Sequence, residues 1–280
     1  MIASKKLNSL DQQELINIAN NSPDCSCRAN AVKLIDDENI LIPIAKNDKD
    51  CLVRQTAVER LTDQETLTFI AQTDKDYFIK MAAIKNITNQ DALCTLAMNY
   101  NEDYYLCKEA IQRITNQECL FNIAQKAMDK DIKSLAVHAI TDQNLLISLV
   151  KNSPDFYLRA DVINKITDQS IIEDIAKNDS DYFVRGIAVH LLANPDIIKF
   201  IAFNDSDYYV RKEAVSEIDD DKVLATIVKN EEDIEVRKKA IKLINDKKIL
   251  RDILKNVNDR YVKRKTIQKL EELGEVVKEI

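Results

Sequence analysis

Glycine and tryptophan are almost missing from this chain of 280 residues: glycine occurs twice and tryptophan not at all. Loops that wrap backbone amides around phosphates need several glycines at set spacings, so Walker-type and dinucleotide-binding loops are excluded. No run of about 18 apolar residues is present that could cross a membrane, and the first ten residues lack the apolar core of a signal peptide. We therefore expect a cytoplasmic protein.

Cysteine and histidine are also too sparse for a metal centre. None of the six cysteines forms a C-x-x-C pair, and only two histidines, His138 and His190, are present, whereas structural zinc sites need such pairs or Cys-His clusters. We interpret the cysteines as small apolar residues of a reducing compartment. We expect no cofactor, no metal and no catalytic residue.

What the chain does have is a phrase that recurs from end to end, an acidic residue followed four positions later by a basic one and then by an apolar pair. The basic residue, which we call the anchor, occupies ten registers, with cysteine replacing it once. The anchors are Arg28, Arg54, Lys80, Cys107, Lys133, Arg159, Arg185, Arg211, Arg237 and Lys263. Every step is 26 residues, except one of 27 before Cys107.

Self-similarity at such a period is typical of a solenoid, in which each unit buries its apolar face only against its neighbours. We predict an all-α fold, a right-handed α-α superhelix of about ten two-helix repeats. The domain prediction is a single domain over 1–280, with a half-repeat cap at 1–23, repeats over 24–259 and a C-terminal capping helix over 260–280.

Each repeat contains two helices that can be located from caps and apolar spacing. In one unit, Asp50 is a good N-cap for a helix A with its apolar face at Val53, Ala57, Val58 and Leu61. The next helix, helix B, follows the cap Asp63 and buries Leu67, Ile70 and Ala71. Helices this short are marginal alone in water, so they must be held by stacking.

The phrase Asp-x-Asp-x-x-Val-Arg-x-x-Ala, as at 48–57 and 179–188, resembles that of HEAT-like repeats of the PBS-lyase type, which belong to the armadillo-like α-solenoids. The stretch 184–205 is also similar to the leucine-rich variant repeat. The resemblance implies a ladder of Asp and Arg contacts between successive repeats. It implies no function by itself, and the iron-binding His-Glu pairs of HEAT-like hydroxylases are absent, because His138 and His190 are followed by Ala139 and Leu191.

The repeat is interrupted at one place. Cys107 is the only anchor that is not basic, and the single inserted residue falls just before it, between Ala97 and Asp103. We expect a local break in the stacking there.

Aromatic residues occupy the second and third positions before most anchors. They are Tyr77, Phe78, Tyr104, Tyr105, Phe156, Tyr157, Tyr182, Phe183, Tyr208, Tyr209 and Tyr261. Tyrosine offers a large apolar area with a polar tip and is enriched at binding hot spots. This aromatic stripe either packs between repeats or grips a peptide or partner helix.

A second candidate surface is the outward side of helix B, where one column varies between repeats. Its members are Ile42, Thr68, Cys94, Phe121, Ile147, Glu173, Lys199, Ala225 and Arg251, with Phe200 and Phe203 beside Lys199. In the family that the chain resembles, helix B lines the concave face. We expect a noncatalytic, monomeric scaffold that binds another protein or peptide through this concave face and the aromatic stripe. The candidate residues are Tyr77, Tyr104, Tyr157, Tyr182, Phe183, Phe200, Phe203, Tyr208 and Tyr209.

The alternative is nucleic-acid binding by a basic patch near the C-terminus, on a scaffold like that of HEAT-like DNA glycosylases. The chain carries a net charge of −7, yet basic residues recur in equivalent places of the last three repeats. The candidate phosphate-binding residues are Lys212, Lys238, Lys239, Lys263, Arg264 and Lys265. Acidic residues such as Glu213 and Glu235 interleave with them and favour a merely solvated face. Binding through phosphates would weaken steeply with salt.

Overall fold

The computed structural model describes residues 7, 9–99 and 103–276, and within these ranges it contains twenty α-helices and no strand. Successive helices pack in pairs that repeat along the chain, which confirms the predicted all-α solenoid. The helices form two compact units, unit 1 up to Leu145 and unit 2 from Leu146 onward. The residue inserted before Cys107 falls next to 100–102, so the expected break at that point lies outside the described residues.

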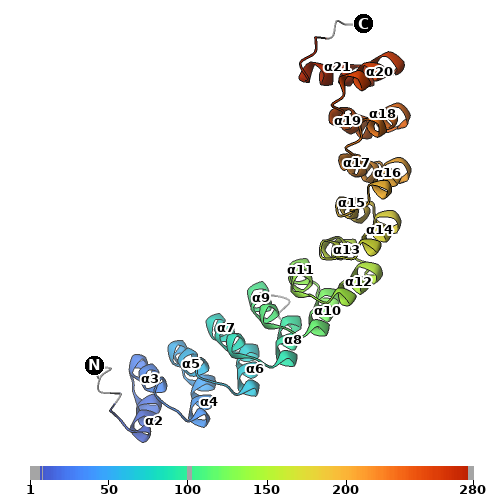
Figure 1. Cartoon of the computed structure of the whole chain (residues 1–280). Helices are drawn as coiled ribbons and strands as arrows, with labels where there is room; N and C mark the ends of the chain where they lie inside the picture. The colour runs from blue at the N-terminus through green and yellow to red at the C-terminus, as the bar shows by residue number, and fades with distance from the viewer. Residues whose placement is uncertain (1–6, 8, 100–102, 277–280) are drawn as a thin grey trace. The chain divides into compact units, whose positions relative to one another are not determined.

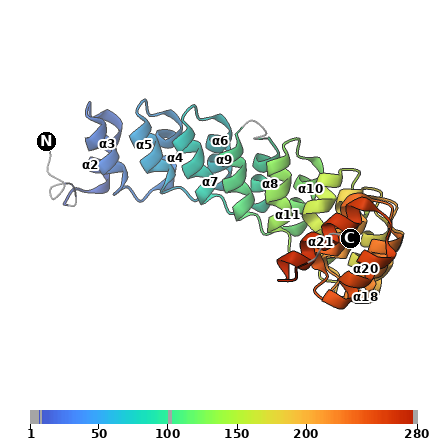
Figure 2. The ribbon, with the colours of Figure 1, turned by 90° about the horizontal axis from the view of Figure 1, so that it is seen from above.

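Unit 1 consists of two parallel rows of helices, which Figures 1 and 2 show from two directions. The helix A row is α3 (Cys25–Val32), α5 (Cys51–Val58), α7 (Tyr77–Asn86), α9 (Tyr104–Arg113) and α11 (Lys130–Ala139). The helix B row is α2 (Gln12–Asn21), α4 (Glu38–Asn47), α6 (Gln64–Thr73), α8 (Gln90–Asn99) and α10 (Gln117–Lys126).

Unit 2 repeats the same two rows. Its helix A row is α13 (Phe156–Ile163), α15 (Tyr182–His190), α17 (Tyr208–Ser216), α19 (Ile234–Leu243) and α21 (Arg260–Glu272). The helix B helices are α12 (Gln143–Asn152), which begins just before the unit boundary, α14 (Gln169–Asn178), α16 (Pro195–Asn204), α18 (Asp221–Asn230) and α20 (Lys247–Asn256).

Every helix A begins at the Asp that stands four residues before its anchor. Asp50, for example, accepts a hydrogen bond from the backbone N–H of Leu52, and Asp63 caps helix B through the N–H of Thr66. Each cap satisfies a free N–H at the positive end of the helix dipole and stabilises the helix by about 1 kcal/mol. The caps explain why helices of eight to ten residues start where the sequence predicts.

The predicted apolar faces form the core. Val53, Ala57 and Val58 of α5 and Leu67 of α6 have no exposed surface, and the corresponding small and β-branched columns are buried in the other repeats. Alanine three residues after the anchor allows successive helices to approach closely, which favours side-by-side stacking of the A helices.

The two rows differ in spacing, and this corrects one expectation. Within each unit neighbouring A helices, such as α3 and α5 or α15 and α17, pack closely, whereas neighbouring B helices, such as α4 and α6, touch little. The more widely spaced row lies on the outer side of each unit, as Figure 1 shows. The prediction that helix B lines the concave face is therefore wrong, because within each unit the A helices stand closer together than the B helices.

Candidate functional site

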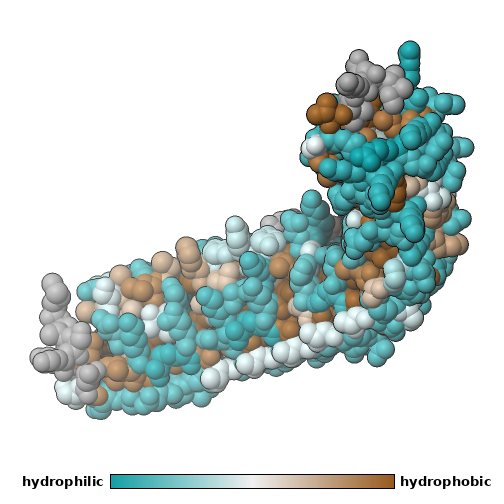
Figure 3. All heavy atoms as spheres, turned by 45° about the horizontal axis from the view of Figure 1, so that its top comes forward, coloured by the Kyte–Doolittle hydropathy of each residue, from teal (hydrophilic) through white to brown (hydrophobic). Residues whose placement is uncertain are grey.

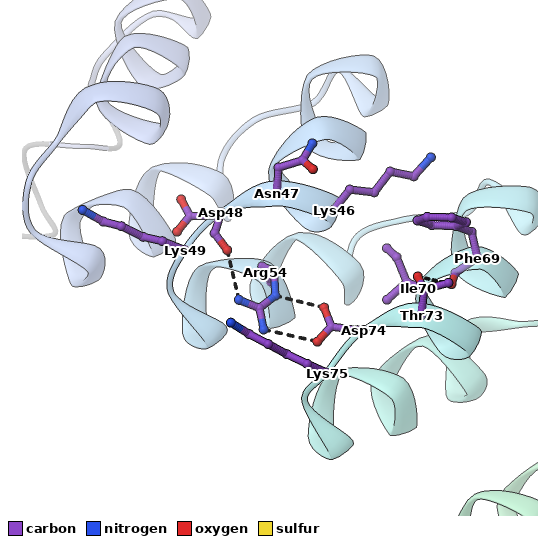
Figure 4. A pocket seen from close by; sticks show the side chains of 10 residues that line it. All are labelled: Lys46, Asn47, Asp48, Lys49, Arg54, Phe69, Ile70, Thr73, Asp74 and Lys75. Carbon is purple, nitrogen blue, oxygen red and sulfur yellow. Dashed lines mark hydrogen bonds and ion pairs between the residues drawn. The ribbon is translucent and has the colours of Figure 1, made fainter.

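The anchor arginines join consecutive repeats through buried two-pronged contacts. Arg54 donates from Nε and Nη2 to the two carboxylate oxygens of Asp74, at 2.9 and 3.2 Å, and from Nη1 to the carbonyl of Asp48 at 3.0 Å. Figure 4 shows this fork between two helix B to helix A turns. Both side chains are more than nine-tenths buried. A planar guanidinium suits such bidentate pairing, which an ammonium cannot reproduce.

The fork recurs with an acidic partner 20 residues after the anchor. The pairs are Arg28 with Asp48, Arg54 with Asp74, Arg159 with Asp179, Arg185 with Asp205, and Arg211 with Glu231. Arg237 has Val257 at that position and instead donates to the cap Asp259 at 2.8 Å. The ladder predicted from the resemblance is thus present, and its partner is usually the first Asp of the Asp-x-Asp motif rather than the cap.

Three consecutive registers lack the residues for a fork. Their anchors are Lys80, Cys107 and Lys133, and the residue 20 positions on is Ala127 after Cys107 and Ser153 after Lys133. Cys107 is fully buried, with its Sγ 3.5 Å from the carbonyl of Ala97. Burial, reinforced by Asp103 and Asp129, raises the pKa of this thiol to about 11, so it stays protonated at neutral pH. The sequence alone indicated this break in the pattern only at Cys107.

A second ladder runs through these registers, and the sequence reasoning missed it. The Gln at the start of helix B reaches the next repeat: the side-chain oxygen of Gln64 accepts hydrogen bonds from the backbone N–H groups of Thr88 and Asn89, at 2.7 and 3.0 Å. Gln90 and Gln117 bind the next Thr-Asn and Thr-Asp turns in the same way. The recurrence of the phrase Thr-Asn/Asp-Gln in the sequence could have indicated this ladder.

A disulfide also joins α8 and α10 where the arginine forks are missing. Cys94 and Cys119 are bonded, with their Cα atoms 6.0 Å apart. The interpretation of all cysteines as free apolar residues is therefore wrong for this pair. The physical reason is that residues 25 apart in consecutive B helices face each other, which a search for C-x-x-C pairs does not detect. The other cysteines that the structure describes form no disulfide.

The forks make stability depend on pH. Burial would raise the pKa of Asp48 and Glu231, but hydrogen bonds from Arg28 and Arg211, together with backbone N–H groups, hold both pKa values below their ordinary 3.8 and 4.5. A folded-state pKa below the unfolded value contributes stability that is present above the unfolded pKa and is lost as the pH falls through the folded one.

We therefore expect the free energy of unfolding to fall as the pH drops below about 4.5. Guanidinium denaturation at several pH values should show a shallower acid loss in Asp48→Asn than in the unmodified protein. Asp196→Asn, at an exposed carboxylate, is the matched control and should leave the slope unchanged. Parallel curves for all three proteins would contradict this role of the forks.

The fork also forms the floor of a notch between successive turns. In unit 1 the notch has a volume of about 530 Å³ and is walled by Phe69, with Lys46, Lys49 and Lys75 on its rim. The Lys46 ammonium lies 5.1 Å from the centre of the Phe69 ring, and Figure 4 shows Lys46 pointing away from Lys49 and Lys75. The equivalent notch in unit 2 contains Phe203, Glu231 and Glu232 and no lysine. The charges around the notch are therefore not a constant feature of the repeat.

The aromatic stripe lies at the first turn of the A helices, and in each unit most of its rings are exposed. The exposed fractions are 37% for Tyr77, 38% for Tyr104, 69% for Tyr157, 50% for Tyr182, 38% for Phe183 and 49% for Tyr208. Edge-to-face pairs form within a repeat, as in Tyr104 with Tyr105 at 5.4 Å. Figure 3 shows the apolar surface as separate areas among hydrophilic ones.

Tyr209 packs between repeats. Its ring lies against Gly186 of α15, where an added Cβ would come within 2.7 Å of the ring. It meets Tyr182 edge to face at 5.7 Å. Burial, followed by Glu213, raises the pKa of its hydroxyl. Tyr209 therefore contacts Tyr182 edge to face and is half-buried, as expected if the stripe packs between repeats.

The same positions hold exposed apolar residues that the candidate set omitted. Phe78 and Tyr105 are 70% and 66% exposed, and Leu52 and Ile234, which are not aromatic, extend the stripe in register. The signal was in the spacing, since all four stand two or three residues before an anchor.

The variable helix B column is mostly half-buried, with Ala225 buried and Arg251 exposed. The exposed column lies one residue later and includes Phe69 and Phe200, at 49% and 54%. The predicted outward column is therefore wrong by one position: the side chain that points most directly to solvent is that of the following residue. Phe203 is exposed as predicted.

The basic candidates do not form a continuous track. Arg211 and Arg237, which stand beside them in the sequence, are engaged by Glu231 and Asp259. Lys212 contacts Glu213 and lies over the Tyr209 ring, Lys238 pairs with Glu235 at 3.2 Å, and Arg264 lies over Tyr261. Lys239 and Lys263 are half-buried, and Lys265 lines a groove with Lys242 and Lys269, two lysines that the sequence reasoning did not select.

Among the described residues, no group of three or more His, Cys, Asp or Glu side chains could hold a metal ion. His190 instead bridges two glutamates, and His138 contacts Ser134 of its own helix. In the same part of the chain, no helix is long and apolar enough to span a membrane.

No protein-family model and no curated protein matches the sequence. Among solved structures, the chain is similar to a leucine-rich repeat variant with a novel repetitive structural motif, at 19% identity over 76% of this chain and 86% of the other, with a TM-score of 0.47. It is also similar to the Escherichia coli protein YibA, at 16% identity over 96% and 95% of the two chains, with a TM-score of 0.25. Likeness at these scores carries no information about function.

Proposed function

We propose that the chain is a noncatalytic HEAT-like scaffold that binds another protein or a peptide along its aromatic stripe, as a monomer. The observation that carries this proposal is the exposure of Tyr182 and Tyr208 at the repeat spacing, about half of each side chain, beside the packed Tyr209. Exposed rings at a regular interval suit an extended partner with side chains at matching intervals.

The stripe has the properties of a binding hot spot. Tyr182 is held by the ring of Tyr209, which is itself seated on Gly186, so little side-chain freedom is lost when a partner binds. Rigid aromatic groups with a polar tip are enriched at such sites. The helix B residues Phe69, Phe200 and Phe203 are a second, smaller apolar surface on the outer row.

Nucleic-acid binding has less support. The basic candidates are partly engaged by glutamates and tyrosines, and acidic residues interrupt them. A phosphate backbone needs a continuous line of free basic groups.

The test is selection of peptides from a random library against the full chain, followed by affinity measurement. We expect Tyr182→Ala with Tyr208→Ala to weaken binding by about 2 kcal/mol, roughly thirtyfold, because two anchor rings are lost. Thr226→Ala, at an exposed position of α18 far from the stripe, is the control and should bind normally. Unchanged affinity in the double variant, or affinity that collapses with moderate salt, would refute the proposal.

A further inference from the structure

The groove between α19 and α21 is lined by like charges. Lys238 and Lys242 come from α19, and Lys265 and Lys269 come from α21, around a cavity of about 270 Å³. Ile241 contributes to the apolar part of the wall, and Glu272 is the one acidic residue that lines it. Four ammonium groups around one cavity repel each other, which is unfavourable unless an anion lies between them.

In the equivalent place between α15 and α17, hydrogen-bonding side chains bridge the two helices. His190 of α15 stands between two glutamates of α17, with Nδ1 2.7 Å from Glu217 and Nε2 3.0 Å from Glu213. His190 lies five residues after its anchor, and the glutamates lie two and six residues after theirs. One basic group thus joins two carboxylates across the helix pair.

At the same three positions of the α19 and α21 pair, all the residues are lysines. Lys242 lies five residues after Arg237, and Lys265 and Lys269 lie two and six residues after Lys263. The two carboxylates that bridge one helix pair are therefore replaced by ammonium groups in the other. Lys265 donates to Gln268 of its own helix at 2.9 Å, and Lys238 pairs with Glu235 of its own helix, so these contacts do not cross the groove.

The charge around the groove is also unlike the rest of the chain. Residues 234–272 contain thirteen Lys or Arg and six Asp or Glu, although the whole chain carries −7. We propose that the α19–α21 groove binds an acidic peptide segment whose carboxylates take the place of the missing glutamates, with an apolar side chain against the methylene chains of the lining lysines. The inference rests on the proposed scaffold function and names the chemistry of a partner at a separate surface.

A peptide fits this groove better than a nucleic acid does. The cavity accommodates one or two side chains, and part of its wall is apolar. The neighbouring basic groups that would extend a phosphate track, Lys212 and Arg264, already lie over Tyr209 and Tyr261. A small cavity with ammonium groups and a partly apolar wall suits a peptide that presents a carboxylate beside a hydrophobic side chain.

The variant Lys242→Glu tests the groove directly. It places a carboxylate near Lys265 and Lys269, so it should neutralise the groove, raise the melting temperature and weaken binding of an acidic peptide. Lys177→Glu on α14 is the matched control, because it changes the net charge equally at an exposed position outside the groove. The probe is a labelled peptide in which two Glu residues one helical turn apart flank a Leu, measured by fluorescence anisotropy on the full chain.

We expect the peptide to bind the unmodified protein and Lys177→Glu alike, and to bind Lys242→Glu at least tenfold more weakly. Its Gln analogue should not bind, and moderate salt should weaken the Glu peptide. Absence of binding to the unmodified protein, equal binding of the Gln analogue, or stronger binding of a single-stranded oligonucleotide would overturn the inference. The Tyr182→Ala and Tyr208→Ala variant should bind this peptide normally, so failure at the groove is distinguishable from failure of the stripe.

Discussion

Replacing Arg185 by Ala should lower the free energy of unfolding by about 3–5 kcal/mol, because the change leaves a buried carboxylate without its partner. Arg185 donates to both oxygens of Asp205, at 2.8 and 2.9 Å, and to the carbonyl of Asp179 at 2.9 Å. Both side chains are about nine-tenths buried, so water cannot fully replace these contacts. Guanidinium denaturation monitored by circular dichroism would measure the loss.

The chain supplies a control of the same chemistry at the surface. Arg251 forms an equally short two-pronged pair with Glu275, at 2.7 and 2.9 Å, but half of its side chain is exposed. Arg251→Ala should therefore change stability little. Arg185→Lys should recover only part of the loss, since one ammonium cannot span both oxygens and the carbonyl. Equal effects of Arg185→Ala and Arg251→Ala, or a loss of peptide binding at Arg185→Ala without a loss of stability, would refute the structural role of the fork.

Reduction of the Cys94–Cys119 disulfide should lower the stability of unit 1 by about 3 kcal/mol, the value expected for a cross-link that closes a loop of this length. The effect should be large here because α8 and α10 lie among the registers in which the anchors are Lys80, Cys107 and Lys133 rather than arginine. Thermal or guanidinium denaturation with and without a thiol reductant would measure it.

The matched variant for this experiment is Cys94→Ser with Cys119→Ser. It should resemble the reduced protein and should not respond to the reductant. Cys107→Ser retains the disulfide and should keep its response, although the buried hydroxyl destabilises the chain on its own account. Detection of two free thiols at these positions by mass spectrometry under non-reducing conditions would contradict the bond.

The arrangement of helices could be predicted because the same capping residues and the same apolar spacing recur in every repeat. Asp50 and Asp63 satisfy free N–H groups at helix starts, and Val53, Ala57 and Leu67 fall on faces that must be buried, so caps and periodicity are enough to locate both helices. The stripe was also predictable in position, because N-terminal turns of successive A helices share one side of each unit.

Contacts between residues about 20 to 27 positions apart were harder to predict from the sequence. They depend on how one helix pair packs against the next. This packing decides which aspartate pairs with Arg54, and it brings Gln64 to the next turn and Cys94 to Cys119. The same packing decides that Tyr209 is seated on Gly186 while Tyr208 stays exposed.

The sequence by itself determined the all-α repeat, the helix starts and the buried columns, since these follow from caps and spacing within one repeat. The tertiary structure alone decided which row lies outside, which basic residues are engaged and which face a like charge. Lys242 illustrates the difference: in the sequence it is one lysine among many, and in the fold it stands where His190 bridges two glutamates in another repeat. Electrostatic pairing depends on distances between side chains, and only the stacking of the helices sets those distances.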